Sequence, residues 1–422
     1  MKIVIIGGGW AGCAAASVAV KTGAQVVLLE RTDMLLGTGL VGGIMRNNGR
    51  FTAAEECIAM GGGLFQLVDD CLRHHNICFP GHAHADLYDI ARLPGAVQRY
   101  LQSAGVQLHY QARVTKTQLI GTRMVSVLTE DGQVFDGDAF IDATGSFGPM
   151  NNCTKHGNGC VMCIMRCPSF GGRVSLCSLA GVKGRSAKRK DGSMGSMSGA
   201  CKLMKDSLSA DIAASLEKDG VVVLPVPPEL QENHLSQKAC QQYALKEYKD
   251  HLIVLDTGHA KLMVSYFELE KLHQIPGFEN ARYEDPYAGG IGNSMRFFDM
   301  APRDDTMKVQ GLENVLCAGE KAGPLVGHTE AMATGMLAGY NAARYAMKRP
   351  LMTLPRTLAV GEAIAWVREM TQTEDGLSLR YTFSGSVLFK RLRDLGLYST
   401  DRQAIAERVD AAGLTLAFSS NK

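Results

Sequence analysis

The chain contains 422 residues, of which 46% are hydrophobic and 20% are charged, with a formal net charge of +2. This composition is typical of a soluble globular protein, and the length favours two or three lobes over a single core. The near-neutral charge neither requires nor excludes a nucleic-acid partner. No apolar run reaches the ~18 residues of a membrane span, and the N-terminus lacks the layout of a signal peptide, so we expect a cytoplasmic protein without a membrane partner.

The N-terminal stretch follows the pattern strand, glycine-rich turn, helix, strand. An apolar run at residues 2–6 predicts a buried strand, and three glycines in G-x-G-x-x-G spacing follow it: Gly7, Gly9 and Gly12. Gly7 allows a tight turn, Gly9 lets a pyrophosphate approach the backbone, and Gly12 lets the next helix pack closely on the sheet. The pattern predicts a βαβ unit that binds a dinucleotide, with the pyrophosphate at the helix N-terminus.

A second apolar run, residues 25–29, ends in Glu30. A carboxylate at this strand end can accept hydrogen bonds from the hydroxyls of an adenosine ribose, and it would repel a 2′-phosphate. The glycine-rich residues 37–43 follow soon afterwards. They could wrap the far half of the dinucleotide, or they could form a mobile surface loop.

Further elements are expected before residue 150. Apolar residues at helical spacing predict helices over about 53–75 and 93–104. Alternating patterns predict three strands of an antiparallel meander: 107–112, 124–129 and 133–135. A buried strand at 139–142 then ends in a small turn at Gly145, which can bring its backbone against the cofactor again.

The C-terminal part returns to the nucleotide fold, with a strand at 314–317 followed by Gly319 and Glu320, and a small-residue helix from about 330 to 344. We therefore expect an α/β fold with a Rossmann-like domain of the two-dinucleotide-fold type, assembled from both chain ends, and an inserted mixed α+β lobe. The expected boundaries are 1–150 and 291–350 for the dinucleotide domain, 151–208 for a cysteine-rich insertion, 209–290 for a substrate-facing lobe and 351–422 for a helical tail.

The chain resembles the GidA family of FAD-dependent flavoproteins, which includes MnmG-like and TrmFO-like tRNA-modifying enzymes. Beyond the N-terminal glycines, two segments carry the resemblance: NSMRFFDMAPRDDTMKVQGLENVLCAGEKAG at 293–323 and GHTEAMATGMLAGYNAARYAMKRP at 327–350. It implies FAD as the cofactor and a two-dinucleotide fold. By position it implies cofactor contacts at Gly7, Gly9, Gly12, Glu30, Gly145, Gly319, Glu320, Gly327 and Thr329.

The same resemblance implies that the helix that starts near Gly327 points its N-terminus towards the flavin. The helix dipole would there stabilise negative charge on a reduced ring. It makes Glu330 and Cys57 catalytic candidates, although Cys57 could instead be a buried apolar residue. His328 is a third candidate, because a histidine that titrates near neutral pH could move the proton that accompanies a hydride. Four other histidines could be ligands or acid–base groups but are expected in exposed loops: His74, His75, His82 and His84.

A cysteine cluster distinguishes this chain from TrmFO-like enzymes. Cys160, Cys163 and Cys167, followed by a proline, have the spacing C-x2-C-x3-C-P. They could hold a [4Fe-4S] cluster, with Cys153 or Cys177 as the fourth ligand. A four-sulfur zinc site and a C-x-x-C redox pair without metal are the alternatives.

Two functions follow from these features. The first is a FAD-dependent oxidoreductase that passes hydride or electrons between a small-molecule substrate and FAD, with a cluster or an electron-transfer partner as relay. The second is a folate- and FAD-dependent RNA uridine C5-methyltransferase, in which a cysteine attacks the base. The basic run at 183–190 would then contact RNA phosphates, and otherwise it is a solvated loop.

The cysteine cluster favours the oxidoreductase, because TrmFO-like chemistry does not call for a cysteine group of this kind. NAD(P)H and folate are candidate co-substrates. A non-catalytic flavin-binding scaffold is a third reading of the same residues. The family resemblance and the apolar C-terminal tail suggest a homo-oligomer.

Overall fold

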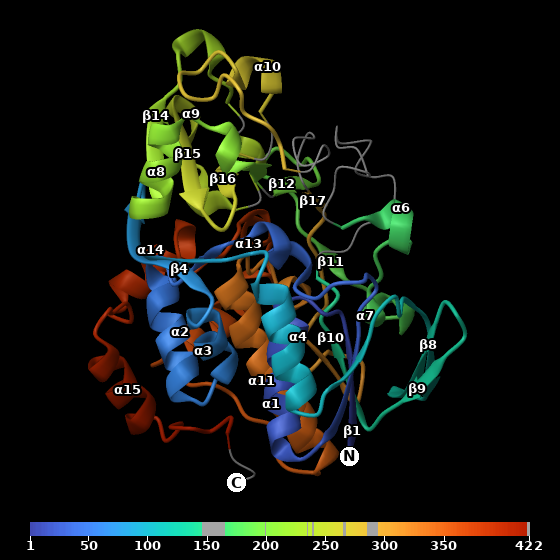
Figure 1. Cartoon of the computed structure of the whole chain (residues 1–422). Coiled ribbons are helices and arrows are strands. Elements are labelled where there is room, and N and C mark those ends of the chain that lie inside the picture. The colour runs from blue at the N-terminus through green and yellow to red at the C-terminus, as the bar shows by residue number, and fades with distance from the viewer. Residues whose placement is uncertain are drawn as a thin grey trace.

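A computed structural model describes residues 1–145, 165–198, 200–233, 235–238, 240–264, 267–284 and 294–419. Its centre is a five-stranded parallel sheet (Figure 1). In spatial order the strands are β19 Val315–Cys317, β10 Ala139–Asp142, β1 Lys2–Ile6, β2 Gln25–Leu29 and β6 Gln107–His109. Because β19 comes from the far end of the chain and pairs with β10, both chain ends build this sheet, which confirms the predicted α/β fold.

The helices of this part of the molecule are α1 Trp10–Ala19, α2 Gly49–Ala59, α3 Gly63–Asp69, α4 Leu93–Ser103 and α11 His328–Ala346. Helices α1 and α11 pack directly against each other (Figure 1). A Cβ on Gly335 would lie 2.2 Å from the carbonyl oxygen of Ala11, and a Cβ on Gly339 would lie 2.2 Å from that of Ala15. The two helices therefore approach each other backbone to backbone, which only glycine allows at these two positions.

Replacing one of these glycines should destabilise the fold. We expect Gly335→Ala to lower the free energy of unfolding by about 2–3 kcal/mol, because the added methyl group must displace backbone atoms. Gly95→Ala in α4 is the matched control, since its Cβ would lie 3.4 Å from the nearest atom, in the flexible side chain of Arg99. That control should be neutral or stabilising by up to about 1 kcal/mol. Equal denaturation midpoints for the two variants would contradict the close helix contact.

The inserted lobe has its own antiparallel sheet and its own hydrophobic core, at the top of Figure 1. In spatial order its strands are β13 Cys201–Leu203, β16 Ala260–Leu262, β15 His251–Asp256 and β14 Val221–Pro225. Its helices are α8 Ala210–Asp219, α9 Glu247–Asp250 and α10 Leu269–Leu272. The sheet thus begins at Cys201, ahead of the start at residue 209 that the sequence predicts for this lobe.

Two small three-stranded sheets flank the centre. One contains β3 Ile44–Met45, β5 His82–Tyr88 and β4 Leu72–Phe79, and the other contains β7 Val114–Ile120, β8 Arg123–Thr129 and β9 Val134–Asp136. The single helix predicted over 53–75 is divided into α2 and α3 at the glycines 61–63, and the prediction is wrong after residue 69, where the chain turns into β4. The predicted meander strand at 107–112 is also wrong in its pairing, since residues 107–109 join β2 in the parallel sheet.

Two histidines expected in exposed loops lie on strands, His82 buried and His74 largely covered, with 10% of its side chain exposed. His82 is 5% exposed in β5, where its ring contacts Asn47 and the backbone carbonyl of Gln242. Burial lowers the pKa of His82 to about 4. His74 in β4 lies 2.9 Å from a carboxylate oxygen of Asp256 in the inserted lobe. Both side chains hold elements together and stay away from solvent, so the expectation of exposed loop histidines is wrong for them.

The segment that precedes the inserted lobe, residues 165–198, pairs with residues 294–300, where the chain returns to the nucleotide domain, through two short antiparallel strand pairs. These are β11 Arg185–Ser186 with β18 Asp299–Met300, and β12 Ser196–Ser198 with β17 Ser294–Arg296. Two short helices, α6 Cys167–Phe170 and α7 Leu176–Leu179, precede them. The basic residues at 183–190 thus include an exposed two-residue strand that pairs next to the nucleotide domain.

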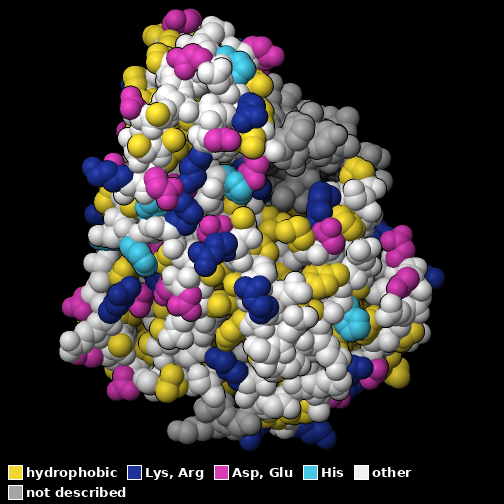
Figure 2. Space-filling view, in the orientation of Figure 1, with side chains coloured by type: hydrophobic (Ala, Val, Ile, Leu, Met, Phe, Trp, Pro, Cys, Tyr) yellow, Lys and Arg dark blue, Asp and Glu magenta, His cyan; other side chains and the backbone are white. Residues whose placement is uncertain are grey.

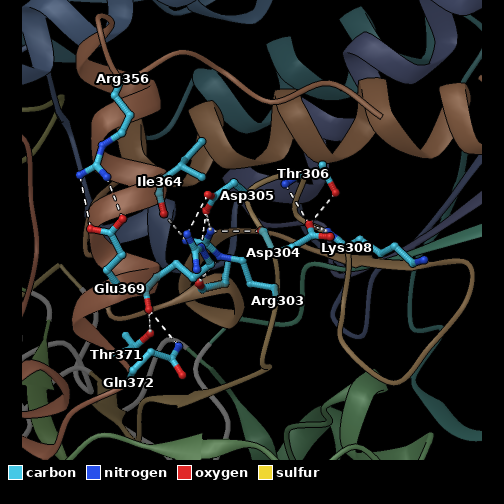
Figure 3. Close-up of polar contacts among 12 residues, drawn as sticks. Arg303, Asp304, Asp305, Thr306, Lys308, Arg356, Ile364, Glu369, Thr371 and Gln372 are labelled. Carbon is cyan, nitrogen blue, oxygen red and sulfur yellow. Dashed lines mark hydrogen bonds and ion pairs between the residues drawn. The ribbon is translucent and has the colours of Figure 1, made fainter. Parts of the chain in front are cut away.

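The C-terminal tail is helical, as predicted, with α12 Ala359–Met370, α13 Glu374–Ser378, α14 Ser386–Asp394 and α15 Arg402–Ala411. It packs against the nucleotide domain. The buried side chain of Arg303 donates to the carbonyl oxygen of Ile364 at 2.8 Å (Figure 3). It also donates to the carbonyl oxygen of Ala322 at 3.0 Å. The carboxylate of Glu56 accepts the N–H of Ala359 at 2.9 Å, at the start of α12. No helix in the described part of the chain combines the length and the apolarity that a membrane crossing requires.

Candidate functional site

A large cavity lies at the carboxyl ends of the parallel strands, between the central sheet and the inserted lobe. Its empty space, including the part open to solvent, is about 1890 Å³. Residues that follow four of the strands line one side of it: Gly7, Glu30, Ala143 and Ala318. Parallel α/β sheets bind ligands at this edge, so the position agrees with the dinucleotide fingerprint.

Backbone conformation and packing within the protein explain why two of the three fingerprint positions, Gly7 and Gly12, must be glycine. Gly7 has a φ of 104°, and a Cβ there would lie 2.4 Å from the carbonyl oxygen of Ala143. A Cβ on Gly12 would lie 1.9 Å from the carbonyl oxygen of Gly7. Gly12 therefore brings α1 close to β1 and does not itself line the cavity.

Gly9 is different. Its φ of −69° suits any residue, and a Cβ there would meet no atom within 4 Å in the described part of the chain. Gly9 lines the cavity and precedes the first turn of α1. Neither its backbone conformation nor its packing requires glycine, so the open space in front of it is suited to a ligand. A helix N-terminus at this point favours an anionic group.

Glu30 lies at the same end of the cavity with its carboxylate held in place. One oxygen accepts the N–H of Gly8 at 2.7 Å, and the other accepts the N–H of Thr32 at 2.7 Å. Both bonds come from the backbone, so they fix the orientation of the carboxylate. Its remaining lone pairs are available to hydroxyl donors from a ligand in the cavity.

Gly145, Gly319, Glu320 and Gly327 also line the cavity. Gly319 has a φ of 66°, and its N–H donates to the hydroxyl oxygen of Thr334 at 2.9 Å. Glu320 forms an ion pair with Arg296, and both side chains are largely buried. The negative charge of Glu320 is thus already matched by an arginine that lines the same cavity.

His328 is the first residue of α11 and lines the cavity. Its Nδ1 lies 3.2 Å from the hydroxyl oxygen of Tyr88. Burial, together with the charges of Arg50, Lys261 and Arg296, lowers the pKa of His328 well below its usual value. The imidazole is therefore neutral at neutral pH, whereas the sequence suggests a group that titrates there.

Thr329 and Glu330 turn away from the cavity. The Thr329 hydroxyl lies 3.2 Å from the Met45 sulfur. Glu330 accepts two hydrogen bonds from Arg50 Nε, at 3.1 Å each, and one from the N–H of Phe383, at 2.8 Å. This buried ion pair ties α11 to α2 and to the C-terminal tail, which favours a structural role for Glu330 over the predicted catalytic one.

The inserted lobe supplies the opposite wall of the cavity. Its residues there are Lys238, Cys240, Gln242, Tyr243, Lys261 and Met263. The sequence does not mark them, because they come from a loop and from β16 and meet only in the folded chain. Burial lowers the pKa of Lys261 to about 7 and that of Lys238 to about 8.

The predicted cysteine sites are placed only in part. Cys57 is buried in α2 and does not line the cavity, and burial raises the pKa of its thiol well above the ordinary value. Cys167 is buried at the start of α6. Within the described ranges, no group of three or more His, Cys, Asp or Glu residues could hold a metal ion. The other three predicted cluster ligands lie outside the described residues: Cys153, Cys160 and Cys163.

The parallel sheet, the glycine turn and the cavity at the strand ends define an α/β protein of the dinucleotide-binding class. The family model described as glucose inhibited division protein A matches residues 2–267 and 256–350. This chain therefore belongs to the GidA family.

Solved structures of GidA from Aquifex aeolicus have the same fold. The form II crystal structure has a TM-score of 0.63 at 16% sequence identity, over 97% of this chain and 76% of that chain. The form I crystal structure has a TM-score of 0.58 at 16% identity, over 97% of this chain and 78% of that chain.

Proposed function

We propose that this chain is a FAD-dependent enzyme that passes hydride or electrons between FAD and a substrate held against the inserted lobe. Membership of the GidA family supports this function. The observation that carries it is the open space at Gly9, beside a helix N-terminus and within a cavity large enough for a dinucleotide. The residues around this space also suit FAD, because the Glu30 carboxylate can accept hydrogen bonds from ribose hydroxyls.

The residues that would hold FAD come from both chain ends. Glu30 would bind the adenosine ribose, and the backbone at Gly9 would bind the pyrophosphate. Gly145 and Gly319 would let the backbone approach the cofactor closely. Gly327 would place the N-terminus of α11 beside the flavin ring, where the helix dipole stabilises added negative charge. When bound, FAD supplies the acceptor and donor of hydride or electrons.

The chain contributes orientation and proton control at His328. A neutral imidazole can donate one hydrogen bond and accept another, and the Tyr88 hydroxyl lies 3.2 Å from its Nδ1. This pair could hold a proton at the cavity wall next to the start of α11. The predicted contacts of Gly12 and Thr329 would be indirect, through helix packing and the position of α11.

The proposal predicts that the purified protein binds about one FAD per chain, which can be released and identified by chromatography. Glu30→Ala should weaken FAD binding about 10-fold or more, because the ribose hydroxyls lose a charged acceptor. Titration of the apoprotein with FAD, followed by flavin fluorescence, measures this. A wild-type chain that binds no FAD under any of these conditions would refute the proposed function.

A second candidate is the folate- and FAD-dependent methylation of RNA uridine, favoured by one observation. Cys240 is a partly exposed thiol on the cavity wall, where it could attack a base, whereas Cys57 is buried elsewhere. On the face shown in Figure 2, however, Lys and Arg side chains are interspersed with Asp and Glu, without one continuous basic surface. Substrate-dependent flavin reduction without RNA would support the oxidoreductase, and tRNA binding with a steep salt dependence would support the methyltransferase.

The cysteine cluster, NAD(P)H as a donor, self-association and a cytoplasmic location stay predictions. Iron and sulfide analysis of anaerobically purified protein tests the cluster. About four irons and four sulfides per chain, lost in a Cys160→Ala, Cys163→Ala double variant, would establish a [4Fe-4S] site. Zinc in their place would favour a structural four-sulfur site.

A further inference from the structure

We propose that the inserted-lobe wall of the cavity binds a small-molecule carboxylate, with the ammonium groups of Lys238 and Lys261 as its charge partners. This inference rests on the proposed function, because it names the class of substrate that would be held against the flavin. It depends on side chains of the inserted lobe, Lys238, Lys261 and Gln242, and on none of the residues proposed to bind FAD.

The two lysines are buried without a matching negative charge in the described chain. Lys261 is 6% exposed, and its Nζ donates to the backbone carbonyl oxygens of Val41 and Gly42. Lys238 is 9% exposed, and its Nζ donates to the carbonyl oxygens of Tyr243, at 3.1 Å, and Met263, at 3.3 Å. Carbonyl groups satisfy hydrogen bonds but carry no net charge. Both ammonium groups therefore lack an anion among the described residues.

The other charged groups of the cavity do not supply that anion. Glu30 is held by backbone N–H groups at the nucleotide end. Glu320 is paired with Arg296, and Arg50 is paired with Glu330. Cys240, which lies between the two lysines in sequence and lines the same wall, contributes a thiol and not a carboxylate.

Leaving ammonium groups buried without an anion is unfavourable, because a charge that loses water needs a partner of opposite sign. The Tyr248 ring, whose centroid lies 4.6 Å from Lys238 Nζ, offsets part of this cost for Lys238. Burial lowers the pKa of both lysines, and an anion bound beside them would favour their charged form again. A carboxylate that enters the cavity would relieve this cost. An RNA phosphate fits less well, since the two lysines are almost fully covered and a polymer backbone binds exposed cations.

A second group points to a ligand at the same wall. Gln242 is 4% exposed and lines the cavity, and its side-chain carbonyl oxygen is buried without a hydrogen-bond partner in the described structure. Native proteins seldom leave a buried polar atom unpaired. This oxygen is therefore suited to an O–H or N–H donor of the ligand. The class of ligand that fits is a small carboxylate with a hydrogen-bond donor close to it.

Three probes of one skeleton test this class on the FAD-loaded protein by isothermal titration calorimetry: mandelate, its neutral amide mandelamide, and phenylacetate, which lacks the hydroxyl donor. We expect mandelate to bind at least about 10-fold more tightly than mandelamide, since each 1.4 kcal/mol of charge interaction is worth that factor. Phenylacetate should lie between them. Equal affinities for mandelate and mandelamide in the wild type would overturn the proposal.

Variants locate the site. Lys238→Met and Lys261→Met should each abolish the preference for mandelate over mandelamide, and Gln242→Leu should abolish the preference for mandelate over phenylacetate. Lys21→Met is the matched control, because its Nζ donates to a backbone carbonyl outside the cavity, at 3.0 Å from Gly61. A preference that survives both lysine substitutions would overturn the proposal. If a variant does not fold, the wild-type comparison of the three probes still decides.

Repeating the titrations on FAD-free protein separates this inference from the proposed function. A chain that binds FAD but shows no preference for mandelate would refute the carboxylate site and leave the proposed function intact. A chain that prefers mandelate but never binds FAD would refute the proposed function and leave the carboxylate site intact.

Discussion

Gly9→Ala should fold as well as the wild type and lose FAD affinity by a factor of about 10–100. A Cβ at residue 9 meets no described protein atom within 4 Å, and its φ of −69° is ordinary for alanine. The methyl group would instead occupy the space next to the pyrophosphate and lengthen charge-assisted hydrogen bonds from the backbone, each worth about 1.5–3 kcal/mol. Thermal denaturation and FAD titration of the same preparation measure the two effects.

Gly12→Ala is the matched control, and it should show the opposite pattern. Its Cβ would lie 1.9 Å from the carbonyl oxygen of Gly7, so we expect a loss of about 3 kcal/mol in stability. Any loss of FAD affinity should then follow the loss of folded protein. If Gly9→Ala bound FAD like the wild type, the space at Gly9 would not be the pyrophosphate site.

Glu330→Gln should lower the free energy of unfolding by about 3–5 kcal/mol, because it leaves the Arg50 guanidinium buried without its counter-charge. The side chains of Arg50 and Glu330 are 4% and 0% exposed. Glu330 raises the pKa of Arg50 against the opposing effect of burial, so the guanidinium keeps its charge in the folded protein. Chemical denaturation measures the loss, and a double variant with Arg50→Met should recover part of it.

An exposed ion pair provides the comparison. Lys390 and Asp394 lie 2.7 Å apart with side chains 78% and 61% exposed. Asp394→Asn should therefore change stability by no more than about 0.5 kcal/mol. If Glu330→Gln unfolds like the wild type but its flavin is no longer reduced by substrate, the catalytic role predicted for Glu330 from the sequence would be favoured over the structural one.

The predictions that the structure confirms rest on local sequence patterns. The strand at residues 2–6 and the tight turn at Gly7 depend on nearby residues and on backbone conformation alone. Patterns failed where a distant partner decides the outcome. Helical spacing continues past Leu64 to Leu72, but the glycines at 61–63 divide the helix into α2 and α3, and from Leu72 the chain forms β4, which pairs with β5.

The amino-acid sequence by itself determined the dinucleotide-binding fold from both chain ends, because the strands, the glycine turn and the small-residue helix are all short-range patterns. Only the tertiary structure decided which charged side chains face the cavity. Glu330 forms an ion pair with Arg50, and Glu320 forms one with Arg296. Lys261 lines the cavity from the inserted lobe, which no sequence motif marks. The physical reason is that burial and charge compensation depend on neighbours from other elements, which spacing along the chain does not encode.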